Sequence, residues 1–311
     1  MALVLQVVVT GLAAGAGYGL VAIGYALVYR LTGVVHFALG ELIGLSVFVT
    51  LFLATGTGPV TRTNLPLGRL LPAVAGGLAL AVGCGLLVYV VAVRPFLRRA
   101  SMLGWIAGVV AVAFAVRGLL AATLSRQSYV FPDLIPFTRL QNGGVLSLGG
   151  GVTLPVRAFF VIGAGLGLAA LAAGFLDRTR HGRAMQAVAE DATAARTIGL
   201  PIEWLRAAAF ALAGGLAALA AVLQAPSVPV FADTGALIGL KGLVAALLAR
   251  FGSPWKAFAA GLAVGVLETG ASSLHIGVLR LGPAYGDVVP LAFALVLVAA
   301  RYRKDQVEVV E

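Results

Sequence analysis

The chain has 311 residues, of which 60% are hydrophobic and only 11% are charged, and its formal net charge is +10. Its mean hydropathy is +1.03. Because about a quarter of the residues of a soluble domain are charged, this composition excludes an ordinary soluble protein. The positive charge does not indicate a nucleic-acid partner, since arginines in short loops beside apolar runs are what retention of those loops in the cytoplasm requires.

Apolar runs long enough to cross the hydrocarbon core, which takes about 20 residues, recur along the chain. Two of them are doubtful as spans: 237–250 is short and contains Lys241, and 286–300 reaches spanning length only if Asp287 lies at an interface. Either 35–55 or 237–250 could instead be a broken or re-entrant element. We therefore expect an all-α, polytopic helical membrane protein with about eight or nine transmembrane or re-entrant helices in a single domain over residues 1–311. The predicted helices are 8–29, 35–55, 70–93, 101–124, 157–176, 205–225, 237–250, 256–276 and 286–300.

The chain contains 41 glycines. Small residues let membrane helices approach closely where lipid supplies no hydrophobic drive between them. The candidates for such contacts are Gly76, Gly77, Gly83, Gly85, Gly163, Gly165 and Gly167.

Three segments rich in basic residues predict the orientation. They are 94–99, 177–206 and 301–304. Two predicted crossings separate 94–99 from 177–206, and four separate 177–206 from 301–304. Because both numbers are even, all three segments lie on one side. By the positive-inside rule that side is the cytoplasm. We therefore expect a cytoplasmic C-terminus, with 125–156 on the outer side.

The segment 177–206 is the most highly charged stretch of the chain, so it cannot be buried in lipid. From Gly182 to Ile198 it is helix-compatible, with apolar residues at spacings of three and four. Gly199 followed by Pro201 predicts where the helix ends. An amphipathic surface helix between spans is the simpler reading of this pattern, and a docking element for a soluble partner is the other. The apolar residues are Met185, Val188, Ala192 and Ala195, and the opposite face carries Arg183, Gln186, Glu190 and Thr197.

Ionisable groups inside membrane segments are costly and usually face a cavity or a partner. Glu41 follows Gly40 in a segment that begins with His36, and we expect these residues to flank a break at which a polar solute passes. The alternative is that Glu41 lies near the interface and pairs with Arg30. Glu268 either lines the same path or makes an interhelical hydrogen bond.

Several kinds of site are missing from the sequence. Cys84 is the single cysteine and the three histidines are scattered, so we expect no metal site and no cofactor. There is no phosphate-binding loop of the form G-x-x-x-x-G-K-[ST] and no hydrolase motif. The chain is therefore not expected to be an enzyme, and any ATP hydrolysis must occur on separate partner chains.

Three blocks, in order along the chain, carry a resemblance to a known family. The first runs from Tyr18 through Tyr29 to Glu41, the second from Arg178 to Leu200, and the third from Gly239 through Pro254 to Glu268. Together they resemble the branched-chain amino-acid permease family (LivH type) of ATP-binding-cassette importers. This sequence departs from the family pattern at His36, where asparagine is usual, and at Leu39, where histidine is usual.

The resemblance implies the transmembrane permease subunit of an importer in the plasma (inner) membrane of a bacterium or archaeon. Its implied partners are cytoplasmic ATP-binding subunits, a second homologous permease subunit and an extracytoplasmic substrate-binding protein. The segment 177–206 would be the cytoplasmic coupling loop, with Arg183, Ala189, Glu190, Asp191 and Gly199 contacting the ATPases. His36, Gly40, Glu41 and Glu268 would line the translocation path.

Other functions stay open at this point. A permease of the same family could carry urea, short amides or another small polar solute. From a different class, the chain could be a secondary transporter or channel that works without ATP, or a structural membrane scaffold that moves no solute.

Overall fold

The computed structural model of the protein describes residues 2–56, 65–99, 101–124, 128–133, 144–147, 153–227 and 229–273, with short pieces at 275–276, 279–280, 292 and 296. The tail 301–304, and with it the predicted position of the C-terminus, lies outside the described residues. So does the predicted helix 286–300, apart from two single positions.

The described residues are mainly α-helical, which confirms the predicted fold class. Five helical segments are long and apolar enough to cross a membrane: Val4–Thr32, Leu67–Leu97, Leu103–Thr123, Val156–Arg178 and Ile202–Ser227. The long helices are α1 (Ala2–Thr32), α2 (Leu39–Thr55), α3 (Leu67–Val88), α5 (Met102–Thr123), α6 (Val156–Arg178), α9 (Ile202–Gln224), α10 (Thr234–Leu248) and α11 (Pro254–Ser273). The short helical segments are the π-helix η1 (Tyr89–Val93), α4 (Arg94–Arg98), α7 (Arg180–Glu190), α8 (Ala192–Thr197) and the 3-10 helix η4 (Ala225–Ser227).

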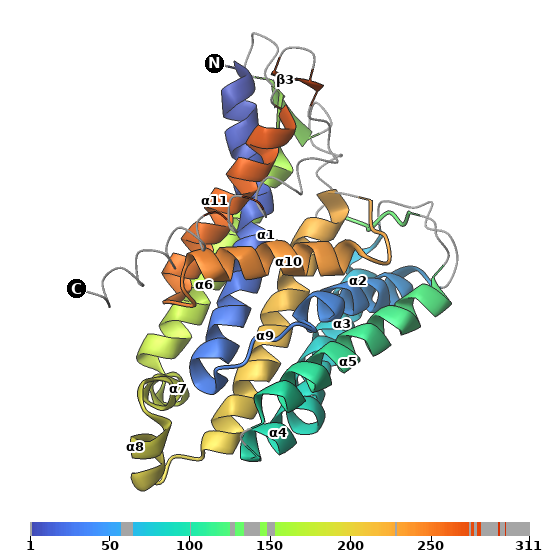
Figure 1. The fold of residues 1–311 in the computed structure, drawn as a ribbon. Helices are drawn as coiled ribbons and strands as arrows, with labels where there is room; N and C mark the ends of the chain where they lie inside the picture. Colours follow the sequence, from blue (N-terminus) through green and yellow to red (C-terminus); the bar gives the residue numbers. More distant parts are fainter. Residues whose placement is uncertain are drawn as a thin grey trace, which may run out of the picture.

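Two small antiparallel pairings add the only strands found in the described residues. β1 (Val145–Ser147) pairs with β2 (Thr153–Pro155), with Leu146 opposite Leu154. β3 (His275–Ile276) pairs with β4 (Leu279–Arg280). Both pairings lie at the same end of the molecule as the N-terminus of α1 (Figure 1).

Helix α1 lies at the centre of the bundle, next to α6, α9 and α11, and α10 crosses it (Figure 1). The contact between α1 and α11 is made backbone to backbone. A side chain at Gly261 would collide with the backbone of Gly19, and one at Gly265 would collide with Gly11 and Gly15. Glycine at these positions therefore allows the two helices to approach closely, as expected for helices packed in a membrane.

Helices α2 and α10 pack against each other in the same way, through Gly40 and Gly44 on one side and Gly235 and Gly239 on the other. They have 17 and 15 residues. At 1.5 Å per residue these lengths correspond to roughly 25 Å and 22 Å, less than the roughly 30 Å of the hydrocarbon core. The two segments named as candidates for a broken or re-entrant element thus correspond to the two shorter apolar helices of the described residues.

The predicted helix 70–93 is longer and less regular than expected. It begins at Leu67, widens into the π-helix η1 at Tyr89 and continues as α4. Pro95 explains the change, because its nitrogen carries no hydrogen and cannot donate into the preceding turn. π-helical turns occur often at functional sites.

Candidate functional site

The charged segment forms two helices, not one. We call α7 and α8 the helix pair (residues 180–197). The predicted continuous helix from Gly182 to Ile198 is wrong at Asp191, which is extended with φ −149° and ψ 102°. Asp191 Oδ1 accepts hydrogen bonds from the backbone nitrogens of Thr193 at 2.8 Å and Ala194 at 3.0 Å. Asp191 therefore caps α8, since a short acidic side chain can satisfy amide groups that have no partner within the helix.

The ends of the helix pair are also fixed by local chemistry. Thr179 caps α7 by accepting a hydrogen bond from the Gly182 nitrogen at 2.9 Å. Gly182 lies so close to the backbone of Phe175 and Leu176 that a side chain would not fit there. At the other end Gly199 adopts φ +82°, which confirms the predicted glycine stop.

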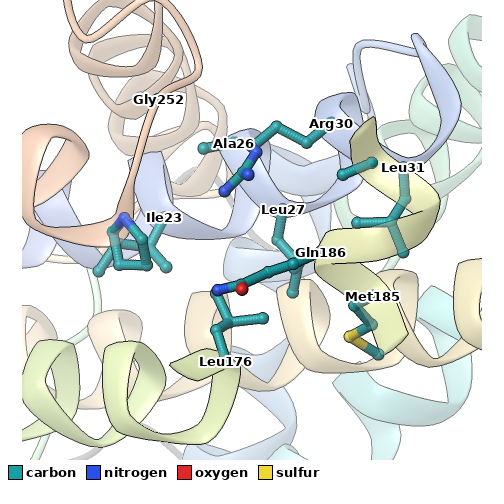
Figure 2. Close-up of a pocket in the computed structure, with 11 residues that line it drawn as sticks. Ile23, Ala26, Leu27, Arg30, Leu31, Leu176, Met185, Gln186 and Gly252 are labelled. Carbon is teal, nitrogen blue, oxygen red and sulfur yellow. The ribbon is translucent and has the colours of Figure 1, made fainter. Parts of the chain in front are cut away.

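One face of the helix pair is anchored to the bundle. Met185, Val188 and Ala195 are buried. They belong to one apolar cluster with side chains of three long helices: Leu27 and Leu31 of α1, Leu176 of α6, and Ile202, Leu205 and Ala209 of α9. Figure 2 shows Met185 and Gln186 beside Leu27 and Arg30 around a small cavity beneath α7. Its volume of about 10 Å³ leaves room for little more than a water molecule. The predicted apolar stripe is therefore the buried side.

The predicted coupling residues lie mainly on the other face. Arg183, Glu190, Asp191 and Gly199 are exposed, and Ala189 is half-buried at the edge of the small cavity. Within the described residues no ion pair involves Arg183 or Glu190. The helix pair thus presents charged groups outward from a rigidly packed base.

Three hydrogen bonds tie α9, directly after the helix pair, to the rest of the bundle. Glu203 Oε2 accepts a hydrogen bond from Arg94 Nε at 2.8 Å and one from the Tyr89 hydroxyl at 3.3 Å. Arg206 Nε donates to the Leu31 carbonyl at 3.0 Å. These contacts join α9 to η1, α4 and the end of α1, and the sequence analysis did not predict them.

A cavity of about 710 Å³ lies in the opposite half of the bundle. Helix α1 contributes residues 10–18 to the cavity, while its residues 27 and 31 contact the helix pair. The other walls come from α6, the end of α9 with the segment after it, α10 and α11. Its lining includes Thr10, Ala14, Tyr18, Arg157, Ala158, Val161, Gln224, Phe231, Leu237, Ile238, Lys241 and Glu268.

The polar groups of this cavity are held in defined positions. Lys241 Nζ lies 2.7 Å from Glu268 Oε1, and the Tyr18 hydroxyl lies 3.4 Å from the same nitrogen. Gln224 Nε2 donates to the Ala14 carbonyl at 2.7 Å. Nearer the start of α6, Arg157 pairs with Asp133. An acid and a base thus meet in a cavity with mostly apolar walls.

The structure separates the residues predicted to line a path. Glu268 lies in the cavity, whereas His36, Gly40 and Glu41 do not line it. His36 is fully buried with its ring 4.9 Å from that of Phe210, and neither of its nitrogens has a hydrogen-bond partner in the described residues. Arg30 lies at the small cavity beneath α7 and makes no ion pair with Glu41.

Sequence reasoning did not predict Tyr18, Gln224 or Lys241 as site residues. Lys241 carried a usable signal, because it is the one charged residue of an otherwise apolar helix and such residues mark functional positions by default. Gln224 carried a weaker signal, as an uncharged polar residue at the end of an apolar run, and Tyr18 carried none. Within the described ranges no group of three or more metal-binding side chains comes together.

Comparisons with known proteins agree over nearly the whole chain. The family described as "Branched-chain amino acid transport system / permease component" matches residues 7–299. The chain is 30% identical over 304 residues to the high-affinity branched-chain amino acid transport system permease protein BraD of Pseudomonas aeruginosa, which covers 96% of this chain and 94% of that protein. It is 27% identical over 296 residues to the permease protein LivH of Escherichia coli, with 94% and 92% covered. This helical membrane protein therefore belongs to the family of permease components of branched-chain amino acid transport systems.

Proposed function

We propose that this chain is the transmembrane permease subunit of an ATP-binding-cassette importer, in which it forms a translocation path for branched-chain or related amino acids. Its partners would be cytoplasmic ATP-binding subunits, a second permease subunit of the same family and an extracytoplasmic substrate-binding protein. Relatives that are named as branched-chain amino acid permeases support the solute class. The hydrolysis of ATP would take place on the partner chains.

The observation that carries this proposal is the exposed charged face of the helix pair on a buried apolar base. A docking element has to be rigid toward its own subunit and polar toward its partner. Met185 and Val188 meet the first condition, and the exposed Arg183 and Glu190 meet the second. Charged, exposed groups of this kind set the specificity of association and its rate.

The connectivity suggests how movement at the helix pair would reach the cavity. Helix α6 leads directly into α7, and α8 leads through a short turn into α9. The far ends of α6 and α9 contribute Val161 and Gln224 to the cavity wall. If ATP binding draws the ATPases together, the helix pair would move with them, and α6 and α9 would tilt as rigid bodies around the cavity.

We assign His36, Gly40 and Glu41 to a second polar region along the path, beside the cavity that contains Glu268. His36 and Glu41 have buried polar atoms that no described residue satisfies. Such atoms in a native structure call for an explanation. A passing polar solute or its water would supply the missing hydrogen bonds in another state of the transport cycle.

A charge reversal tests the coupling role. Glu190→Lys in the assembled transporter should leave membrane insertion intact and abolish uptake, because the exposed face of the helix pair would then repel its partner. Arg69→Glu is the matched control, since Arg69 is exposed at the start of α3, far along the chain from the helix pair. Full uptake by Glu190→Lys at normal expression would contradict the proposal.

Two further measurements separate the other classes of transporter. Depletion of ATP at a clamped membrane potential should stop uptake, whereas a secondary transporter or channel would continue to work. A cysteine introduced at Ala187 or Arg183 should be inaccessible to an impermeant reagent outside intact cells. Labelling from outside would show that the helix pair does not face the cytoplasm.

A further inference from the structure

The Lys241–Glu268 ion pair is the most unusual feature of the cavity. The Lys241 side chain is 9% exposed and that of Glu268 is 18% exposed. Removing two charges from water costs as much as their attraction returns, so apolar residues of similar size would stabilise the bundle equally well or better. Stability alone therefore does not account for a lysine in the middle of α10.

The pair also has an acceptor that is not in use. Glu268 Oε1 contacts Lys241, but Glu268 Oε2 accepts no hydrogen bond from the described residues. The last torsion of a glutamate side chain is broad, so the carboxylate can turn an oxygen toward the cavity while the rest of the side chain stays in place. A group that donates hydrogen bonds is needed there.

The walls of the cavity are mostly apolar. Val161 of α6, Leu237 and Ile238 of α10 and Ala14 of α1 belong to its lining. The volume of about 710 Å³ lies within the roughly 300–1,000 Å³ of small-molecule pockets. The ring of Tyr18 lies 5.4 Å from Lys241 Nζ and helps to hold the ammonium group in place.

We propose that Lys241 and Glu268 recognise the two charged groups of a zwitterionic α-amino acid with an aliphatic side chain. The ammonium group of the ligand donates to Glu268, its carboxylate accepts from Lys241, and its side chain packs on Leu237 and Ile238. This inference rests on the proposed function, and it adds the binding site and the orientation of the solute within it.

Charge balance favours a zwitterion over other small solutes. The site is neutral with the pair formed, and it stays neutral when a zwitterion binds, with each charge beside an opposite one. A simple amine or a simple carboxylate would bring an unbalanced charge into a low-dielectric cavity, which is costly. Urea or a short amide carries no full charge, so it would give neither Lys241 nor Glu268 an opposite charge.

The experiment measures binding of tritiated L-leucine to the full-length chain in lipid nanodiscs. The key variant is the neutral double replacement Lys241→Met with Glu268→Gln, which leaves no unpaired charge behind. We expect it to insert and to melt like the original protein while it binds leucine about ten- to hundredfold more weakly, the effect of losing charge-assisted hydrogen bonds. Lys256→Met is the matched control, because Lys256 is exposed on α11, the same helix as Glu268.

Competition with partial ligands tests the charge requirement. Isoamylamine lacks the carboxylate and isocaproate lacks the ammonium group, but both keep the branched tail. Neither should displace leucine at concentrations at which unlabelled leucine does. The proposal is overturned if the neutral double variant binds leucine as tightly as the original protein, or if either partial ligand competes as well as leucine.

The two proposals fail in different ways. If uptake by the original protein does not depend on ATP while leucine binding still depends on Lys241 and Glu268, the importer function is wrong and the binding site stands. If the neutral double variant shows normal ATP-driven uptake, the proposed binding site is wrong and the importer function stands.

Discussion

Arg94 Nε donates to Glu203 Oε2 at 2.8 Å, and this contact joins the start of α4 to the first turn of α9, directly after the helix pair. Both side chains are 40% exposed, and the ion pair therefore contributes no more than about 0.2–1 kcal/mol to stability. Its position is more informative than its energy. The contact links α9, at the end next to the helix pair, to α4, which directly follows the irregular turn η1.

We expect the Arg94–Glu203 contact to matter for coupling more than for folding. Glu203→Ala should leave thermal stability nearly unchanged but lower uptake several-fold while ATP hydrolysis continues, because movement of α9 would no longer be passed to α4. The reversed pair, Arg94→Glu with Glu203→Arg, should recover part of the uptake. If uptake and ATP hydrolysis fall in proportion, the contact is not part of the transmission.

Two substitutions of Asp191 can separate its predicted coupling role from its structural role as the cap of α8. Asp191→Asn keeps an oxygen that can cap α8, whereas Asp191→Ala removes it at a cost of about 1 kcal/mol. Hydrogen exchange of the amides of Thr193 and Ala194 should therefore accelerate in the alanine variant and stay nearly unchanged in the asparagine variant. Loss of uptake in the asparagine variant, with α8 still protected, would show that the charge itself contacts a partner.

Two glycines of α11 form a matched pair for testing helix packing. Gly261→Ala places a methyl group on the backbone of Gly19, so α1 and α11 must separate and the folded chain should be lost or strongly destabilised. Gly270→Ala meets nothing within 4 Å in the part of the chain that the structure describes and should be neutral or stabilising, by up to about 1 kcal/mol from helix propensity. Thermal melts in nanodiscs measure both. Equal stability of the two variants would contradict the close contact between α1 and α11.

Met185 anchors the helix pair and should be sensitive to truncation. Its side chain is 1% exposed, and Met185→Ala should cost about 2–5 kcal/mol because a cavity remains. The expected result is faster hydrogen exchange and proteolysis in α7. Ile198→Ala is the control, because Ile198 is 74% exposed and its truncation should not change these properties in the isolated chain.

Much of the fold could be predicted because its cause is local. Apolar runs of sufficient length, such as those around α5 and α6, form helices in a membrane whatever surrounds them. The helix stop at Gly199 also followed from local chemistry, since glycine tolerates φ +82°. The break at Asp191 was missed because aspartate is compatible with a helix interior and becomes a cap only where the chain turns.

The sequence alone predicted only some of the glycines that make close contacts between helices. Of the seven predicted positions, Gly76, Gly77, Gly85 and Gly165 lie close to neighbouring residues, whereas Gly83, Gly163 and Gly167 meet nothing within 4 Å among the described residues. The glycines that join α1 to α11 were not among the predicted set. Composition indicates that close contacts exist, but the facing helix decides which glycines make them.

The sequence by itself determined that this protein lies in a membrane, that it is helical, and that one segment is too highly charged to suit lipid, because these properties follow from the transfer of side chains between water and hydrocarbon. Only the tertiary structure decided that Lys241 meets Glu268, which lies 27 positions further along the chain, and that both face one cavity with Tyr18. The physical reason is that hydropathy depends on each residue alone, whereas a binding site depends on which helix faces come together.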